Sequence, residues 1–253
     1  MTQINFLHPP QPPRELMALR PYQEEAKTAI LRQWRDGVKR TLLVLVTGGG
    51  KTIIFSKVIE ELVRKGERVL VLAHRGELLD QAADKLAQST GLKCATEKAE
   101  RSCLDDDDQR WYRVVVGSVQ SMMRPQRLER FDRDHFSTIV VDEAHHVLAD
   151  SYMRILEYFG DAKVLGVTAT PDRGDMRNLG AVFETLAYEY TLPRAIREGF
   201  LCRIEAMTIP LKLDISGVKI SAGDYALGSL GGALEPYLEQ IAAEMAKVCL
   251  KDR

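Results

Sequence analysis

Five short apolar runs, separated by stretches of helical character, are the feature that most constrains the fold of this chain of 253 residues. Continuous apolar runs of this kind are typical of strands that are buried on both faces of a parallel sheet. The runs are Thr41–Val46, Arg68–Ala73, Arg113–Val116, Thr138–Val141 and Lys163–Val167. The sequence therefore predicts an α/β fold, a doubly wound and mainly parallel sheet with helices on both faces.

Longer segments lie between and around these runs and have the character of helices. They are Leu19–Gly37, Thr52–Lys65, Gly76–Gln88 and about Glu235–Leu250. In a doubly wound fold, ligands gather at the carboxyl ends of the strands. The residues that directly follow each apolar run are therefore the candidates for a functional site.

The composition is that of an ordinary globular chain, with 45% hydrophobic and 28% charged residues. The formal net charge of −1 gives no sign of a nucleic-acid partner, whose binding would depend on a local basic face. No apolar run approaches the ~18 residues that span a bilayer, so we expect no membrane partner. The four cysteines are scattered, which suggests neither a zinc site nor a disulfide framework and indicates a cytoplasmic protein with reduced thiols.

A glycine-rich turn directly follows the first apolar run. Glycines let the backbone curl with its N–H groups inward and leave room for phosphate oxygens, and the start of a helix adds unpaired donors. Lys51 would then hold the β- and γ-phosphates, and the Thr52 hydroxyl would ligate magnesium. The strict pattern has glycine where this chain has Leu45, and a plain glycine turn is the alternative. The predicted site for ATP and Mg²⁺ comprises Thr47, Gly48, Gly49, Gly50, Lys51 and Thr52.

An acidic pair follows the run Thr138–Val141. A P-loop enzyme needs a carboxylate at a strand end to hold magnesium, and a group that positions or deprotonates the attacking water. Asp142 suits the first role and Glu143 the second, and Lys51 completes the predicted catalytic set. Acidic residues also favour helix starts. Because the pair lies on a separate strand of the sheet that carries the glycine turn, the catalytic interpretation is preferred.

The glycine turn and five further motifs, in order, resemble the first RecA-like motor domain of superfamily-two helicases and translocases, in the broad DEAD/DEAH-box sense. The resemblance extends over roughly Leu19–Leu201, most of the chain. Besides the glycine turn, the matching runs are Leu19–Gln23 (Q motif), Ala73–Leu78 (motif Ia), Gly117–Ser121 (a nucleic-acid-contacting loop), Asp142–His145 (motif II, spelled DEAH) and Thr168–Thr170 (motif III). The resemblance implies that Gln23, with Arg20 nearby, reads the adenine edge.

The resemblance also implies contacts with nucleic acid. Arg75 stands at a predicted strand end, where its guanidinium and nearby backbone donors suit a phosphate. Ser118, Gln120 and Ser121 supply neutral donors that hold a sugar–phosphate backbone without reading its sequence. A solvated arginine and ordinary turn chemistry are the alternatives for these residues.

Three further residues are expected to couple nucleotide and nucleic acid. Thr168 and Thr170 would hydrogen-bond toward the Asp142 loop, or else cap the helix that follows. In the family, the position of His145 couples the two motor domains. His145 and His146 are adjacent on one predicted helix and point in different directions, so we do not expect them to share a metal ion.

The expected polymer is DNA. Asp172–Arg173 and Leu192–Leu201 resemble the DNA translocases, namely the motor subunits of type I and type III restriction enzymes and the XPB-like repair helicases. RNA-directed DEAD-box proteins usually have aspartate at the position of His145. The arginine-rich stretch Arg124–Arg133 is interrupted by acidic residues, and we interpret it as a solvated helical face.

The sequence predicts three parts: a flexible leader over residues 1–18, the RecA-like domain over 19–211, and a glycine-rich segment with a C-terminal helix over 212–253. In the family, ATP lies between two RecA-like domains, and nothing after Leu201 resembles a second such sheet. We therefore expect a chain that binds ATP but hydrolyses it weakly until a second domain is supplied. A nucleotide-dependent binding module or switch without unwinding activity is the alternative, and a metabolic kinase would leave the Q-like and Ia-like runs without a role.

Overall fold

The computed structural model describes residues 18–204, apart from 74–75, 99–100 and 170–177, together with residues 218, 220–221, 224–225, 231 and 233–249. The chain divides into two compact units, Met1–Cys202 and Arg203–Arg253. The expected leader falls outside the described residues except for its last position, and so does the end of the expected RecA-like domain, residues 205–211. Each unit is described by itself.

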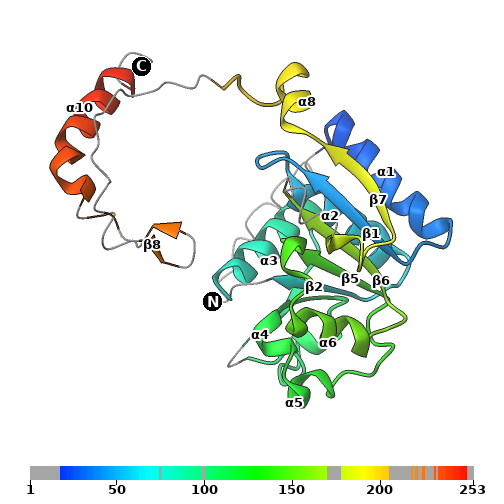
Figure 1. Cartoon of the computed structure of the whole chain (residues 1–253). Coiled ribbons are helices and arrows are strands. Elements are labelled where there is room, and N and C mark those ends of the chain that lie inside the picture. Colours follow the sequence, from blue (N-terminus) through cyan, green and yellow to red (C-terminus); the bar gives the residue numbers. More distant parts are fainter. Residues whose placement is uncertain are drawn as a thin grey trace, which may run out of the picture. The chain divides into compact units, whose positions relative to one another are not determined.

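The first unit is built on a seven-stranded sheet in the order β3-β4-β2-β5-β6-β1-β7, in which every neighbouring pair is parallel (Figure 1). The strands are β1 (Arg40–Leu45), β2 (Val69–Ala73), β3 (Cys94–Glu97), β4 (Val114–Ser118), β5 (Thr138–Asp142), β6 (Lys163–Thr168) and β7 (Thr185–Tyr190). The predicted doubly wound α/β fold is confirmed.

Helices cover both faces of this sheet. The elements are α1 (Pro21–Arg35), α2 (Lys51–Arg64), α3 (Gly76–Thr90), α4 (Val119–Met122), α5 (Pro125–Leu128), α6 (Asp150–Tyr158) and α8 (Leu192–Arg197), with the 3₁₀ turns η1 (Gln109–Trp111) and η2 (Ala144–His146). Successive strand residues point to opposite faces. Leu43 and Leu45 accordingly join the core beneath α1, α2 and α3, whereas Leu42 and Val44 join the core beneath α4, α5 and α6.

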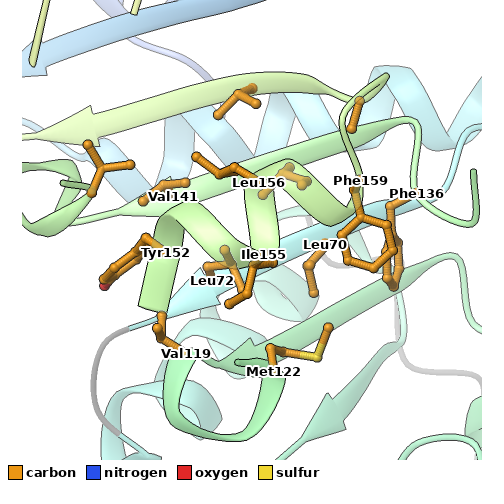
Figure 2. Close-up of a cluster of buried hydrophobic side chains, with 14 of the residues drawn as sticks. Leu70, Leu72, Val119, Met122, Phe136, Val141, Tyr152, Ile155, Leu156 and Phe159 are labelled. Carbon is orange, nitrogen blue, oxygen red and sulfur yellow. The ribbon is translucent and has the colours of Figure 1, made fainter. Parts of the chain in front are cut away.

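The second of these cores is shown in Figure 2, where side chains of the sheet meet those of α6. Leu72 of β2 and Val141 of β5 pack against Ile155 and Leu156, and all four are at most 1% exposed. Burying a side chain of this size contributes about 1.5–3 kcal/mol. The strands that lead to the candidate site residues are therefore held in place by core packing.

The strand order brings three predicted motifs to one edge of the sheet. β6 lies between β5 and β1, so the residues that follow all three strands are neighbours at the carboxyl edge. Asp142 is paired with Val167, and Val44 with Thr168. The glycine turn, the acidic pair and Thr168 thus lie side by side although they are far apart in sequence.

The second unit contains a short antiparallel pair, β8 (Ile220–Ser221) and β9 (Asp224–Tyr225), then the turn η3 (Glu235–Tyr237) and the helix α10 (Leu238–Cys249). The predicted terminal helix is confirmed. The sequence placed a boundary after residue 211, whereas the compact units divide after Cys202. Within the part of the chain that the structure describes, no helix has both the length and the apolar character that a membrane span needs.

Candidate functional site

The glycine turn follows β1 and leads directly into α2, which begins at Lys51. Gly48 and Gly50 have φ values of 83° and 85°, the left-handed region that glycine adopts without strain. A Cβ atom on Gly49 would lie 3.0 Å from Leu45 Cδ2, and one on Gly50 would lie 2.5 Å from Gln23 Nε2. Both conformation and space therefore require these glycines, and Leu45, where the strict pattern has glycine, is buried beneath the turn.

The turn is fastened from outside by α1. The Tyr22 hydroxyl donates a hydrogen bond to the Gly49 carbonyl oxygen over 2.8 Å, and Gln23 Nε2 donates to the same oxygen over 3.1 Å. Gln23 Oε1 accepts from the Arg20 backbone N–H at 3.0 Å. The side-chain amide that was expected to face an adenine is thus bonded to the phosphate loop and to its own helix start in this structure.

The acidic pair follows β5 in an unusual backbone conformation. Glu143 has φ 51°, and among the described residues it is the only one other than glycine with a positive φ. Such a conformation costs on the order of 1–2 kcal/mol for a residue with a Cβ atom. The Glu143 backbone N–H donates to Asp142 Oδ1 over 3.0 Å. This strained turn directs two adjacent carboxylates from one strand end.

Lys51 and Glu143 meet across the edge of the sheet. The distance from Lys51 Nζ to Glu143 Oε1 is 3.7 Å, and the two side chains are 16% and 39% exposed. The lysine thus faces the acidic loop rather than bulk solvent. An ammonium group from the start of α2 and a carboxylate from the loop after β5 thus lie within ion-pair distance of one another.

His145 and Thr168 extend this group toward β6. His145 Nδ1 lies 3.5 Å from Glu143 Oε2 and 3.3 Å from Thr168 Oγ1. The expected contact between Thr168 and the acidic loop is therefore present, whereas Thr170 lies outside the described residues. The rings of His145 and His146 are tilted against one another with centroids 4.0 Å apart. Among the described residues, no group of His, Cys, Asp and Glu is arranged to hold a metal ion by protein ligands alone.

The electrostatics of the site suit a hard cation. Burial raises the pKa of Asp142, and the neighbouring Glu143 carboxylate raises it further, against the opposing effects of the Glu143 N–H, Lys51 and Lys85. At the Asp142 carboxyl group, burial and the second carboxylate outweigh the two lysines. Mg²⁺ prefers carboxylate, hydroxyl and phosphate oxygens, and Asp142 and Thr52 would supply a carboxylate and a hydroxyl to it.

The predicted nucleic-acid residues differ in their surroundings. Ser118 and Ser121 are buried, their hydroxyl oxygens are 2.8 Å apart, and Ser118 caps α4 by accepting from the Ser121 N–H. This is the turn chemistry that the sequence offered as the alternative. Gln120 is exposed on the same short helix. Arg75 lies outside the described residues.

Sequence reasoning assigned no site role to Tyr22. Tyr22 is buried on α1 together with Ala26 and Ile30, and no local pattern tells a core tyrosine from one whose hydroxyl reaches a loop 27 positions away. The same applies to the contact between His145 and Glu143, since spacing alone does not reveal the positive φ that turns Glu143 toward the histidine.

Comparisons with known proteins agree with this geometry. The family described as "Type III restriction enzyme, res subunit" matches residues 16–173, more than half of the chain. IRC3 of Saccharomyces cerevisiae, provisionally named an ATP-dependent helicase, is 36% identical over 231 residues, covering 85% of this chain and 32% of that protein. The Type I restriction enzyme EcoAI endonuclease subunit of Escherichia coli is 29% identical over 211 residues, covering 80% of this chain and 25% of that protein.

A solved structure gives the same result for the fold. The helicase domain of Hef from Pyrococcus furiosus matches with a TM-score of 0.55 and 25% identity, over 66% of this chain and 38% of that one. The chain spans a third or less of the length of the two curated relatives. The chain belongs to the family of the type III restriction enzyme res subunit, and its first unit is the first RecA-like motor domain of the superfamily-two helicases and translocases.

Proposed function

We propose that this chain is the ATP-binding half of a DNA helicase or translocase motor, which couples ATP hydrolysis to movement on nucleic acid. The observation that carries the proposal is the approach of Lys51 Nζ to Glu143 Oε1 at 3.7 Å. It joins the phosphate loop to the acidic strand end across β6. The names of the relatives, an ATP-dependent helicase and a restriction-enzyme subunit, support the same kind of motor.

Each residue of the site has a role in this proposal. The backbone N–H groups of Gly48 and Gly50 cradle the phosphates, whereas the Gly49 N–H donates to the Val46 carbonyl oxygen over 2.9 Å and holds the turn. Lys51 neutralises the β- and γ-oxygens. Thr52 and Asp142 would hold Mg²⁺, which would supply positive charge against the developing negative charge on the phosphates. Glu143, whose backbone is already strained into position, orients the attacking water.

The nucleic-acid face is proposed to lie beyond β2 and β4. Arg75 and the exposed Gln120 contact the sugar–phosphate backbone, while Ser118 and Ser121 hold α4 in place beneath it. His145 and Thr168, already in contact, transmit changes at the nucleotide toward the rest of the motor. Thr170 is proposed to share this role. DNA is the proposed polymer because restriction enzymes are among the relatives.

The site is proposed to be completed by a second RecA-like domain. The chain covers only 32% and 25% of the two relatives, which leaves room in proteins of that kind for such a domain. Arginines supplied from a second domain accelerate phosphoryl transfer by about 10³–10⁵ in other P-loop enzymes. A cytoplasmic location is also proposed, because the described cysteines Cys94, Cys103 and Cys202 are free thiols.

The test compares this chain with a longer protein that includes a second RecA-like domain. Both are titrated with ATP and with single-stranded DNA, duplex DNA or RNA, and ATP turnover is measured in the same samples. We expect the chain alone to bind ATP with weak turnover, and the longer protein to hydrolyse ATP with stimulation by duplex DNA. Brisk DNA-stimulated hydrolysis by the chain alone would contradict the half-site, and stimulation by RNA alone would contradict DNA as the polymer.

A further inference from the structure

The carbonyl group of Gly49 is held by two side chains of α1, and this fixes the direction of one peptide unit of the phosphate loop. In a planar trans peptide, the C=O of one residue and the N–H of the next point in opposite directions. The Gly49 oxygen is directed toward Tyr22 and Gln23. The Gly50 N–H, on the other side of the same peptide, is therefore directed away from α1.

That direction matters because a phosphate loop binds through backbone N–H groups. A glycine peptide flips readily, since no Cβ atom restricts its two residues. Gly48 and Gly50 already have positive φ values, so this backbone has alternatives of similar energy. The hydrogen bonds to the Gly49 oxygen select one of these backbone conformations before any nucleotide binds.

Tyr22 is itself held rigidly enough to act as such an anchor. Its ring stacks on the ring of Tyr190 of β7, with centroids 4.1 Å apart and planes 3° from parallel, and the edge of Phe200 meets it at 4.9 Å. Tyr22 is 2% exposed. The stacked ring of Tyr190 fixes the position of the Tyr22 ring, so the Tyr22 hydroxyl has little freedom to leave the Gly49 oxygen.

We propose that Tyr22 is a positioning residue for nucleotide phosphates, whose hydroxyl orients the Gly49–Gly50 peptide so that the Gly50 N–H faces the ligand. This inference rests on the proposed ATP site and assigns a new residue to it. Tyr22 touches neither nucleotide nor magnesium in this account. It acts through the loop, alongside the Gln23 amide that shares the carbonyl.

The test uses Tyr22→Phe in the full chain, with Tyr190→Phe as the matched control. Each substitution removes one hydroxyl and keeps the stacked ring, but the Tyr190 hydroxyl donates to Glu198 Oε2 at 2.7 Å instead of to the loop. Affinities for MgADP and for adenosine are measured by displacement of a fluorescent nucleotide. Loss of one neutral hydrogen bond predicts a fall of between about twofold and tenfold in MgADP affinity for Tyr22→Phe. Adenosine affinity, and all affinities of Tyr190→Phe, should match the wild type.

A second measurement separates this inference from the proposed function. In the nucleotide-free chain with ¹⁵N-labelled glycine, the Gly50 amide signal should shift in Tyr22→Phe and remain in place in Tyr190→Phe. Failure of the wild type to bind MgADP would remove the proposed function, and the amide signal would then decide the inference alone. The inference is overturned if the Gly50 signal is unchanged, if MgADP binds Tyr22→Phe as tightly as the wild type, or if Tyr190→Phe or adenosine shows the same loss.

Discussion

Two turns at the same edge of the sheet each join a strand to a helix: the phosphate loop after β1 and the Ser118–Ser121 turn after β4. Their hydrogen bonds and charges differ. At the first, Lys51 faces a carboxylate from another strand, and the loop carbonyl is held from behind. At the second, Ser118 and Ser121 bond to one another and cap a four-residue helix. At the start of α2 the polar side chains face another part of the protein, whereas at the start of α4 the two serine hydroxyls bond to one another.

The difference shows that a place at the carboxyl edge of a parallel sheet does not by itself make a ligand site. What distinguishes the phosphate loop is that its Gly49 carbonyl group accepts hydrogen bonds from two side chains of α1, while Lys51 lies near the carboxylates that follow β5. The serine turn stabilises the strand–helix junction. Substitutions at the two places should therefore separate binding from stability.

The largest effect is expected for Lys51→Ala. Charge-assisted hydrogen bonds contribute about 1.5–3 kcal/mol each, so the affinity for MgATP should fall by about tenfold or more. The Glu143 carboxylate loses only a partly exposed partner, so thermal stability should change little. Fluorescent-nucleotide binding and a melting curve measure the two effects. If Lys51→Ala bound MgATP as tightly as the wild type, the phosphate loop would not differ from the serine turn as a binding site, and the contrast between them would be wrong.

Gly50→Ala should weaken both binding and folding. Its φ of 85° costs a residue with a Cβ atom about 1–2 kcal/mol, and the new methyl group would lie 2.5 Å from Gln23 Nε2. Gly66→Ala is the matched control, because Gly66 has φ 87° but no atom within 4 Å of the new methyl group. Chemical denaturation should give a similar backbone cost for both variants, and only Gly50→Ala should also lose MgATP affinity. Equal nucleotide affinity in the two variants would show that the contact with Gln23 is unimportant.

Ser118→Ala should cost about 1 kcal/mol of stability, the usual effect of removing an N-cap side chain. Its MgATP affinity should equal that of the wild type. In the longer motor protein, Ser118→Ala should weaken DNA binding less than Gln120→Ala does. If Ser118→Ala weakened DNA binding more while the folding stability stayed constant, the serine hydroxyl would be a direct contact and the contrast between the two turns would fail.

Tyr152→Phe should have the smallest effect. Tyr152 lies in the core drawn in Figure 2, and its buried hydroxyl has no hydrogen-bond partner among the residues that the structure describes. Burial, with the nearby Asp142 and Glu143, raises the pKa of this phenol to about 12. Removing an unsatisfied buried polar group is neutral or stabilising by up to ~1 kcal/mol. Denaturation curves of Tyr152→Phe and the wild type test this. A loss of stability would show that the Tyr152 hydroxyl has a hydrogen-bond partner, as the hydroxyls of Ser118 and Ser121 do.

Much of the fold could be predicted because its central strands are buried on both faces. The five apolar runs correspond to β4, β2, β5, β6 and β1, which are contiguous in the sheet. The edge strands β3 and β7 were not predicted. Each has a neighbour on one side only. The residues of β3 alternate between partly exposed and buried positions, and in β7 only Tyr190 is buried. A four-residue strand such as Cys94–Glu97 carries too few apolar residues to stand out.

The phosphate loop and the acidic strand end could also be predicted, since each depends on residue types at fixed spacing after a strand. Contacts that depend on the packing of distant elements could not. Nothing local indicates that Gln23 bonds to Gly49, or that the Ser118 hydroxyl is occupied by Ser121. The sequence predicts the helix on which Gln23 lies and the strand that leads to Ser118, and only the tertiary structure shows which group each side chain bonds to.

The central claim, that the phosphate loop and the acidic strand end form one MgATP site, is tested most directly by calorimetric titration of ATP with and without Mg²⁺ into wild type and Asp142→Ala. We predict that Mg²⁺ strengthens ATP binding to the wild type, and that Asp142→Ala loses this dependence while keeping the Lys51-dependent affinity for ATP without magnesium. An equal effect of Mg²⁺ on both proteins would show that the two motifs do not share a site.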